Sequence, residues 1–194
     1  MELHEKMATA AAAVVEVARN VRPDQLDKPT PCPDWDVRTL VNHLVFWSAF
    51  RSELAARKQT APADDPVTEQ TDFTRGDWAE TFASQLDKAV TAWGEPGATE
   101  GETGLAGGSM PARLIGSMML GELVVHGWDL ARATGQEIDA DPAVVASVLD
   151  MATEMGPMGR KMGAFGDEVS VPESAPPLDR LLGASGRNPG WSLS

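Results

Sequence analysis

Apolar residues recur with the period of an α-helix along most of the chain, and this pattern predicts helices over residues 2–20, 77–93 and 113–134. The apolar positions of the first helix are Met7, Ala11, Val14, Val15 and Ala18. A further helix is predicted to begin at Asp141, because an N-cap residue followed by a proline is a typical helix start. We expect this helix to fray into residues 155–159.

Another helix is predicted from Asp36 to about Arg57. Residues 28–36 contain three prolines, which disfavour helix and leave an extended connector, and Asp36 then provides an N-cap. The inward stripe of this helix comprises Leu40, His43, Leu44, Trp47 and either Phe50 or Arg51. A histidine is therefore expected among residues that face the core.

The remaining segments read as loops. Residues 58–75 are acidic and proline-containing, which is typical of a solvated loop. Residues 94–108 contain six glycines without the Lys-Ser/Thr of a phosphate loop, and we expect a flexible connector bordering a pocket. No stretch alternates like a strand. The predicted class is all-α, with a helical bundle over residues 1–160 and a Pro/Gly-rich tail over 161–194 that packs on it.

Composition restricts the possible partners and the compartment. The formal net charge of −13 argues against a nucleic-acid or anionic-membrane surface, so the expected partner is a small molecule or another protein. Cys32 is the single cysteine, which excludes an internal disulfide, and the first residues lack the pattern of a signal peptide. We therefore expect a soluble, cytoplasmic protein with no membrane-spanning segment.

The predicted helix over 113–134 carries candidate metal ligands on a mostly apolar stripe. Glu122, His126 and Asp129 are spaced i, i+4 and i+7 and share one face. Burying a charged side chain without a partner destabilises the folded protein by roughly several kcal/mol. A bound cation offsets this cost when it is held by a carboxylate and a neutral imidazole together. This pattern indicates a divalent-metal site.

His43 is the candidate third ligand, since it meets Glu122 and His126 if the two helices pack together. Two imidazoles and a carboxylate are typical of an open catalytic site, most often of Zn²⁺, although Ni²⁺, Fe²⁺ or Mn²⁺ accept the same ligands. Asp129 either accepts a hydrogen bond from the other ring nitrogen of His126, which fixes the tautomer and orientation of the ring, or is a fourth ligand. Ordinary core histidines and a surface Glu–His pair are the alternatives. Cys32 reads as a packing residue rather than a nucleophile.

Two motifs resemble a known family. Residues 30–43, from Thr30-Pro-Cys-Pro-Asp-Trp-Asp to His43, and residues 121–135, with Glu-Leu-Val-Val-His-Gly-Trp-Asp, are similar to the DinB-like, or mycothiol-dependent maleylpyruvate isomerase N-terminal, superfamily. The ending at residues 180–191 is similar to one subgroup of these actinobacterial metal-binding proteins. The resemblance covers nearly the whole chain.

The resemblance implies a four-helix bundle with a long crossover, with a divalent ion held by His43, Glu122 and His126. It also implies mycothiol, a low-molecular-weight thiol, as cofactor or co-substrate, its sulfur activated by the ion. Arg113 and Trp128 are candidate cofactor-binding residues, and either Arg113 or Arg187 is the candidate arginine for a dicarboxylate. The resemblance also implies that family members with isomerase activity carry a further α/β domain. Here only the Pro/Gly-rich tail over residues 161–194 follows the bundle, so the resemblance does not imply the isomerase reaction itself.

Three functions agree with these features. The first is a metal- and mycothiol-dependent S-transferase or isomerase acting on a small molecule, with catalytic residues beyond the metal ligands not identified. The second is a metal-binding or small-molecule-sensing bundle without catalysis, and the third is a structural bundle without metal. A homodimer is compatible with the first two.

Overall fold

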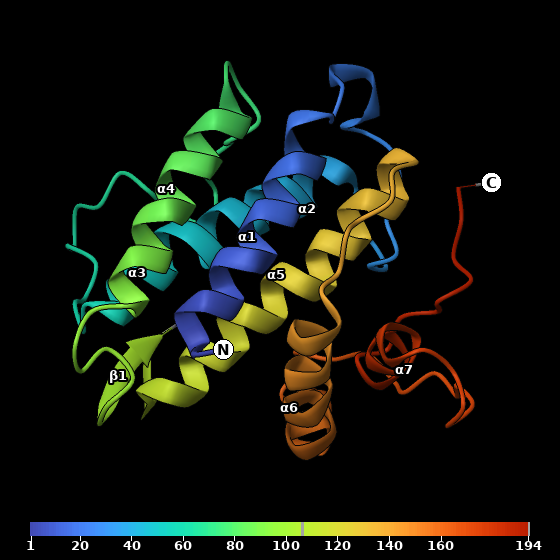
Figure 1. The fold of residues 1–194 in the computed structure, drawn as a ribbon. Helices are drawn as coiled ribbons and strands as arrows, with labels where there is room; N and C mark the ends of the chain where they lie inside the picture. Colours follow the sequence, from blue (N-terminus) through green and yellow to red (C-terminus); the bar gives the residue numbers. More distant parts are fainter. Residues whose placement is uncertain (106, 194) are drawn as a thin grey trace.

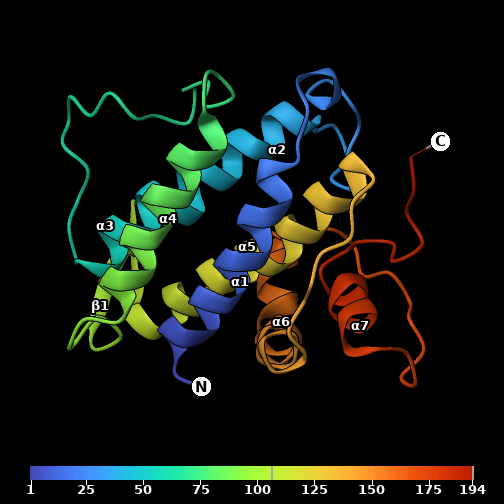
Figure 2. The ribbon, with the colours of Figure 1, turned by 45° about the horizontal axis from the view of Figure 1, so that its top comes forward.

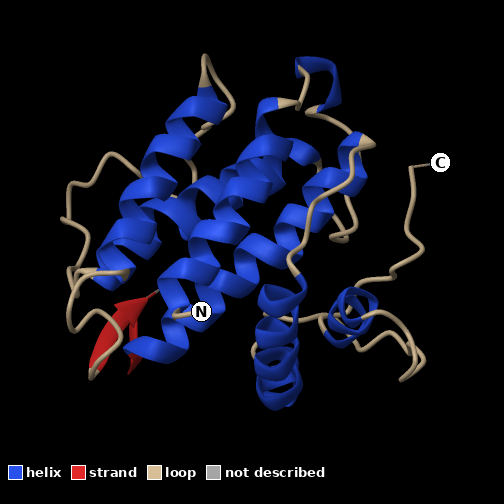
Figure 3. Cartoon of the chain, viewed as in Figure 1, coloured by secondary structure: helices blue, strands red, loops and turns tan. Residues whose placement is uncertain are grey.

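The computed structural model describes residues 1–105 and 107–193, and these are predominantly helical (Figures 1 and 3). The all-α class is confirmed. The elements are α1 (Leu3–Arg19), η1 (Pro23–Gln25), α2 (Val37–His43), η2 (Leu44–Arg51), α3 (Ser52–Ala56), α4 (Trp78–Trp93), β1 (Glu102–Leu105), β2 (Gly108–Pro111), α5 (Ala112–Thr134), α6 (Pro142–Lys161) and α7 (Pro177–Ala184).

Four long segments surround the core. α1 packs against α4 and α5, and the continuous segment α2–η2–α3 packs against the same two helices. Leu40, Leu44, Ile115, Leu120 and Leu130 are among the fully buried side chains between them. The predicted stripe of α1 is buried as expected, and the long loop between α3 and α4 provides the crossover.

The helix predicted from Asp36 to about Arg57 is not a regular α-helix. Asp36 caps it as predicted, since its carboxylate accepts from the Thr39 amide at 2.8 Å, but Leu44–Arg51 forms a π-helix. A π-helix bonds i to i+5, so the stripe drifts from the α-helical period. Trp47 and Phe50 are consequently only half-buried, whereas Ser48 and Ala49 are buried.

The glycine-rich connector contains the largest departure from the predicted elements. β1 and β2 form an antiparallel hairpin, drawn in red in Figure 3, where we expected no strand. Gly107 supplies a positive φ of 79° in the turn, and the Thr103 hydroxyl donates to the Ala55 carbonyl at 2.7 Å. Tertiary contact with α3 therefore orders a segment whose glycine content suggested flexibility.

α6 and α7 lie beside each other outside the four-helix arrangement, and α7 is the one farther from the hairpin in both views (Figures 1 and 2). α6 does not fray at residues 155–159 as expected but continues past Pro157 to Lys161. Arg160 donates to the Ala184 carbonyl at 3.2 Å, so contact with α7 supports its last turn. None of the helices in the described part of the chain has the length and hydropathy needed to cross a bilayer.

Candidate metal centre

The three predicted ligands converge between α5 and the end of α2. Nε2 of His43 lies 2.7 Å from Oε2 of Glu122, and Nε2 of His126 lies 3.5 Å from the same oxygen. One ligand atom of each residue lies within 4.8 Å of those of the other two. The helical spacing of α5 brings Glu122 and His126 to one face, and the packing of η2 and α2 on α5 adds His43.

Asp129 holds the far side of the His126 ring. Its Oδ2 lies 2.9 Å from Nδ1 of His126, which makes Nδ1 the donor and leaves Nε2 free to face Glu122 and His43. Asp129 is completely buried. A carboxylate in this position can fix the tautomer and orientation of the imidazole.

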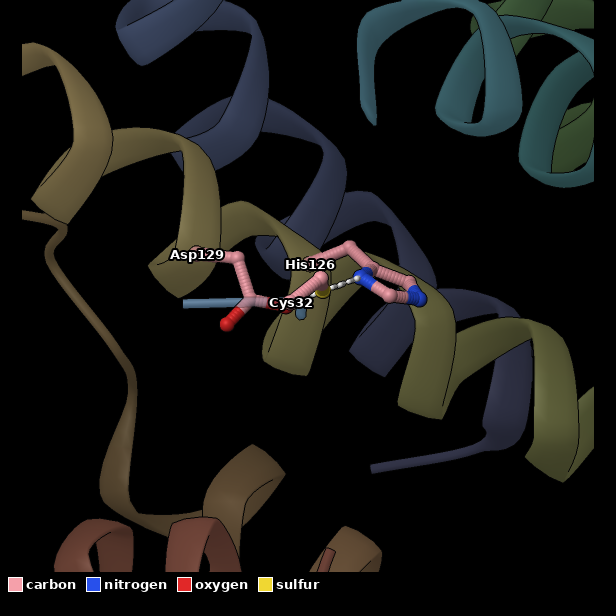
Figure 4. Close-up of side chains that lie close together, drawn as sticks. All are labelled: Cys32, His126 and Asp129. Carbon is pink, nitrogen blue, oxygen red and sulfur yellow. Dashed lines mark hydrogen bonds and ion pairs between the residues drawn. The ribbon is translucent and has the colours of Figure 1, made fainter. Parts of the chain in front are cut away.

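Two further side chains contact the same carboxylate oxygen. The Cys32 thiol donates to Oδ2 of Asp129 at 3.1 Å, and Nη2 of Arg187 donates to it at 3.1 Å. Figure 4 shows Cys32 from the connector before α2 beside His126 and Asp129 of α5. Cys32, His126 and Asp129 also form a cluster of ligand types. Because the Arg187 guanidinium already places a positive charge there, a cation is better accommodated on the Nε2 side of His126.

Trp35 covers both histidines. Its ring stacks on His126 with centroids 5.7 Å apart and is tilted against His43 at 4.8 Å. The His43 and His126 rings themselves lie edge to face at 4.8 Å. The aromatic contacts fix the orientation of the two imidazoles before any ligand binds.

The charges at the centre depend on one another. Burial lowers the pKa of His126, but the Glu122 charge and hydrogen bonds with Asp129 and Cys32 outweigh it and raise the pKa to about 10. Burial raises the pKa of Glu122, yet the charges of His126 and His43 hold it below its ordinary value. The pKa of Asp129 is lowered against burial by His126 and Arg187. Without an ion, a proton on His126 supplies the positive charge.

The arrangement fits a divalent cation. Two imidazole nitrogens and one carboxylate oxygen are the donors that zinc accepts in sites with an open position, and they already point toward one another. The side chains of His43 and Glu122 remain 23% and 29% exposed, so a small molecule can reach the open position.

The predicted cofactor-binding residues lie elsewhere. Arg113 is exposed on the first turn of α5. Trp128 is buried, and the guanidinium of Arg132 lies 5.9 Å from the centroid of its ring. Of the two arginines considered from the sequence, Arg187 is the one that reaches the centre, from the segment that follows α7.

A cavity of about 300 Å³ extends from the centre between α5, α6 and the tail. Glu122, His126, Ser185 and Arg187 provide its polar lining. Neither Arg113 nor Trp128 is among the described residues that line it. His43 instead borders an open groove of about 460 Å³, together with Trp35, Asn42 and Glu69 among others. The three ligands thus stand between a groove and a cavity.

Comparison with known proteins gives the family. The family model described as the mycothiol maleylpyruvate isomerase N-terminal domain matches residues 7–131, a range that includes the three candidate ligands. The chain belongs to this family. The predicted resemblance is therefore confirmed at the level of the family.

Related proteins extend the likeness beyond that domain. Two uncharacterized proteins of Mycobacterium tuberculosis, MT0763 of strain CDC 1551 and Rv0738 of strain H37Rv, are each 31% identical over 186 residues, which is 95% of this chain and of each relative. Crystal structures of the mycothiol-dependent maleylpyruvate isomerase and of a histidine-to-alanine mutant superpose with TM-scores of 0.54 and 0.62 at 15% identity, covering 99% of this chain and 82% of theirs. At that identity the superposition shows a shared fold.

Sequence reasoning missed the residues that build the cavity. Its wall along α6 includes Met151, Met155 and Met158 and continues to Met162, the residue that follows the helix, and these methionines are spaced 4, 3 and 4 residues apart. That spacing is a visible helical stripe. This methionine stripe was missed in the sequence because the same segment contains Pro157 and two glycines, which indicated the end of the helix.

Proposed function

We propose that this chain is a divalent-metal-dependent enzyme that uses a low-molecular-weight thiol of the mycothiol type to transform a small electrophilic molecule, as an S-transferase or isomerase. The observation that carries the proposal is the convergence of His43, Glu122 and His126 within 4.8 Å. Membership in a family named for a mycothiol-dependent isomerase supports the choice of thiol. We place the reaction in the cytoplasm.

The donor set favours Zn²⁺ as the ion. His43, Glu122 and His126 would hold it, and when bound it supplies a Lewis acid that stabilises a thiolate at neutral pH. Asp129 keeps the proton of His126 on Nδ1, so that Nε2 presents its lone pair. Arg187 and Cys32 in turn hold Asp129 by donating to its Oδ2, and Trp35 limits rotation of the rings.

The two spaces beside the ligands suit two different reactants. The groove at His43 has polar side chains, including Thr39, Asn42 and Gln70, and suits a hydrophilic thiol. The cavity beside Glu122 and His126 suits the molecule that the thiol attacks. In this arrangement the two reactants meet at the ligands, which provides the proximity that a bimolecular reaction needs.

Metal content tests the proposal. Protein purified without a histidine tag is analysed for metal after incubation with Zn²⁺, comparing wild type with His43→Ala, His126→Ala and His4→Ala. His4 is the remaining histidine of the chain; it lies on α1, and its variant serves as the control. We expect roughly one ion per chain in wild type and in His4→Ala, and loss of the ion in the other two variants. Equal metal content in all four proteins would refute the site.

Thiol consumption tests catalysis. Mycothiol, or an analogue with its cysteinyl group, is incubated with a panel of electrophiles, and loss of free thiol is followed with zinc-loaded and chelated protein. We expect loss that depends on the metal and on His126. Metal binding without metal-dependent thiol loss would instead assign the chain to the non-catalytic metal-binding or sensing proteins.

A further inference from the structure

Six of the nine methionines of the chain line the cavity beside the proposed metal ligands: Met110, Met118, Met151, Met155, Met158 and Met162. Methionine is unbranched and polarizable, and it is common on surfaces that adapt to apolar ligands of varied shape. Val148, Ala152 and Leu181 form a buried floor between them. The walls therefore offer an adaptable apolar surface.

The charged side chains of the cavity already contact one another or Asp129, although Nε of Arg187 has no hydrogen-bond partner among the described residues. His126 faces Glu122 at 3.5 Å and Asp129 at 2.9 Å, and Arg187 faces Asp129 at 3.1 Å. A dicarboxylate placed here would bring two further negative charges beside Glu122 into a space lined by six methionines, where the Arg187 guanidinium already has an acidic partner in Asp129. Such burial without compensation is costly.

The cavity has the form of a pocket for a small molecule. Its mouth contains Met158 and Met162, which are 54% and 72% exposed, whereas its polar end contains Glu122 and the buried His126. The volume of about 300 Å³ lies at the lower end of ligand pockets, which span about 300–1,000 Å³. An entering apolar molecule is thus directed toward the groups that we propose to hold the metal.

We infer that this cavity binds an uncharged, largely hydrocarbon small molecule as the second reactant of the enzyme, and that it selects against dicarboxylates. The role as reactant rests on the proposed function. Binding itself needs neither metal nor thiol, because the methionine walls are present without them. The adaptable walls give the site a broad tolerance for the shape of the hydrocarbon part.

Fluorescence of N-phenyl-1-naphthylamine, an uncharged probe that brightens in apolar sites, tests this inference on the full chain, both chelated and zinc-loaded. We expect saturable binding in both states. Two competitors of equal carbon number, 2-nonanone and the dicarboxylate azelate, are compared on wild type, and only the ketone is expected to displace the probe. Equal displacement by both, or no probe binding in either state, would overturn the inference and leave the metal and thiol tests unaffected.

Variants of α6 locate the bound probe. Met155 is half-buried in the cavity wall, so Met155→Glu adds a carboxylate there, whereas Met155→Leu keeps the wall apolar. We expect the first to weaken the probe Kd by roughly tenfold or more and the second by less than about twofold. Thr153→Glu adds the same charge at an exposed position of the same helix and should leave Kd unchanged.

Unchanged Kd in Met155→Glu would overturn the assignment of the site. Light scattering provides a second check, because a second copy of the chain could cover the mouth instead of a ligand. A wild-type dimer that excludes the probe and that Met155→Glu converts to a monomer would also overturn the inference.

Discussion

One carboxylate oxygen organises the residues around the centre. Oδ2 of Asp129 is contacted by Nδ1 of His126, the Cys32 thiol and Nη2 of Arg187, at 2.9, 3.1 and 3.1 Å. Its other oxygen, Oδ1, has no hydrogen-bond partner among the described residues. Asp129 therefore acts through its neighbours, by orienting His126 and balancing the charge of Arg187.

Replacing Asp129 by asparagine tests this role. The amide lacks the negative charge that holds the Nδ1 proton and Arg187, so we expect zinc affinity to fall roughly 10- to 100-fold. Competition with a chromophoric chelator measures the affinity. Asp150→Asn removes a charge from an exposed position of α6 and should bind zinc like wild type; equal affinity in the two variants would contradict the role of Asp129.

The proton on His126 gives the metal-free protein a pH-dependent stability. The pKa of His126 rises from 6.5 to about 10 on folding, so its contribution is complete below pH 6.5 and is lost as the pH rises through 10. We expect the urea midpoint of chelated protein to fall between pH 7 and 10. His126→Gln should flatten this dependence, and a wild-type midpoint that stays constant over the range would contradict the expectation.

Among the elements, the segment after α7 packs its backbone closely against the segment that follows α6. Gly186 has a φ of 85°, and a Cβ there would lie 2.7 Å from the Cα of Gly166. Arg187 follows it directly, so the close approach of these two backbones places the guanidinium at Asp129.

Gly186→Ala should therefore affect both stability and the metal. Strain at a positive φ costs about 1–3 kcal/mol, and the clash with Gly166 adds to it, so we expect a lower thermal midpoint. Displacement of Arg187 should also weaken zinc binding. Gly190→Ala, whose Cβ would meet its nearest neighbour at 3.4 Å, is the control, and an unchanged midpoint in Gly186→Ala would argue against this packing.

The elements that local pattern determines were predictable, and those that tertiary contact determines were not. The stripe of α1, the cap at Asp36 and the end of α5 at Thr134, before Gly135 with its φ of 71°, follow from residue period and backbone preference. The π-helix over Leu44–Arg51 and the hairpin depend on packing against other elements. The spacing of Glu122 and His126 indicated the ligands, but no local signal placed Arg187 beside them.

Across the whole molecule, the tail completes both the core and the cavity. Leu181 is fully buried and belongs to the main core cluster, while Ser185 and Arg187 line the cavity. Arg132 of α5 also donates to the Trp191 carbonyl at 2.8 Å. These contacts join the tail to the bundle, and we expect the stability of the bundle to depend on them.

A chain ending at residue 160 should accordingly be less stable than the full chain. It exposes the surface under Leu181 and leaves Asp129 without Arg187, and breaking a buried ion pair alone costs about 3–5 kcal/mol. Thermal unfolding followed by circular dichroism measures the loss. Arg187→Met should reproduce part of this loss of stability. Arg180→Met, at an exposed position of α7, should cause no loss. A truncated chain as stable as the full one would contradict this dependence.

The shared oxygen of Asp129 has a thermodynamic consequence. Since His126 and Arg187 contact the same atom, the free energy of loading an ion and that of docking the C-terminal segment are linked, and linkage is reciprocal. If displacing Arg187 weakens zinc binding, as expected above, then bound zinc must stabilise the docked segment by the same free energy. Amide hydrogen exchange around residues 185–191 would then slow on addition of zinc, although these residues are not among the proposed ligands of the ion.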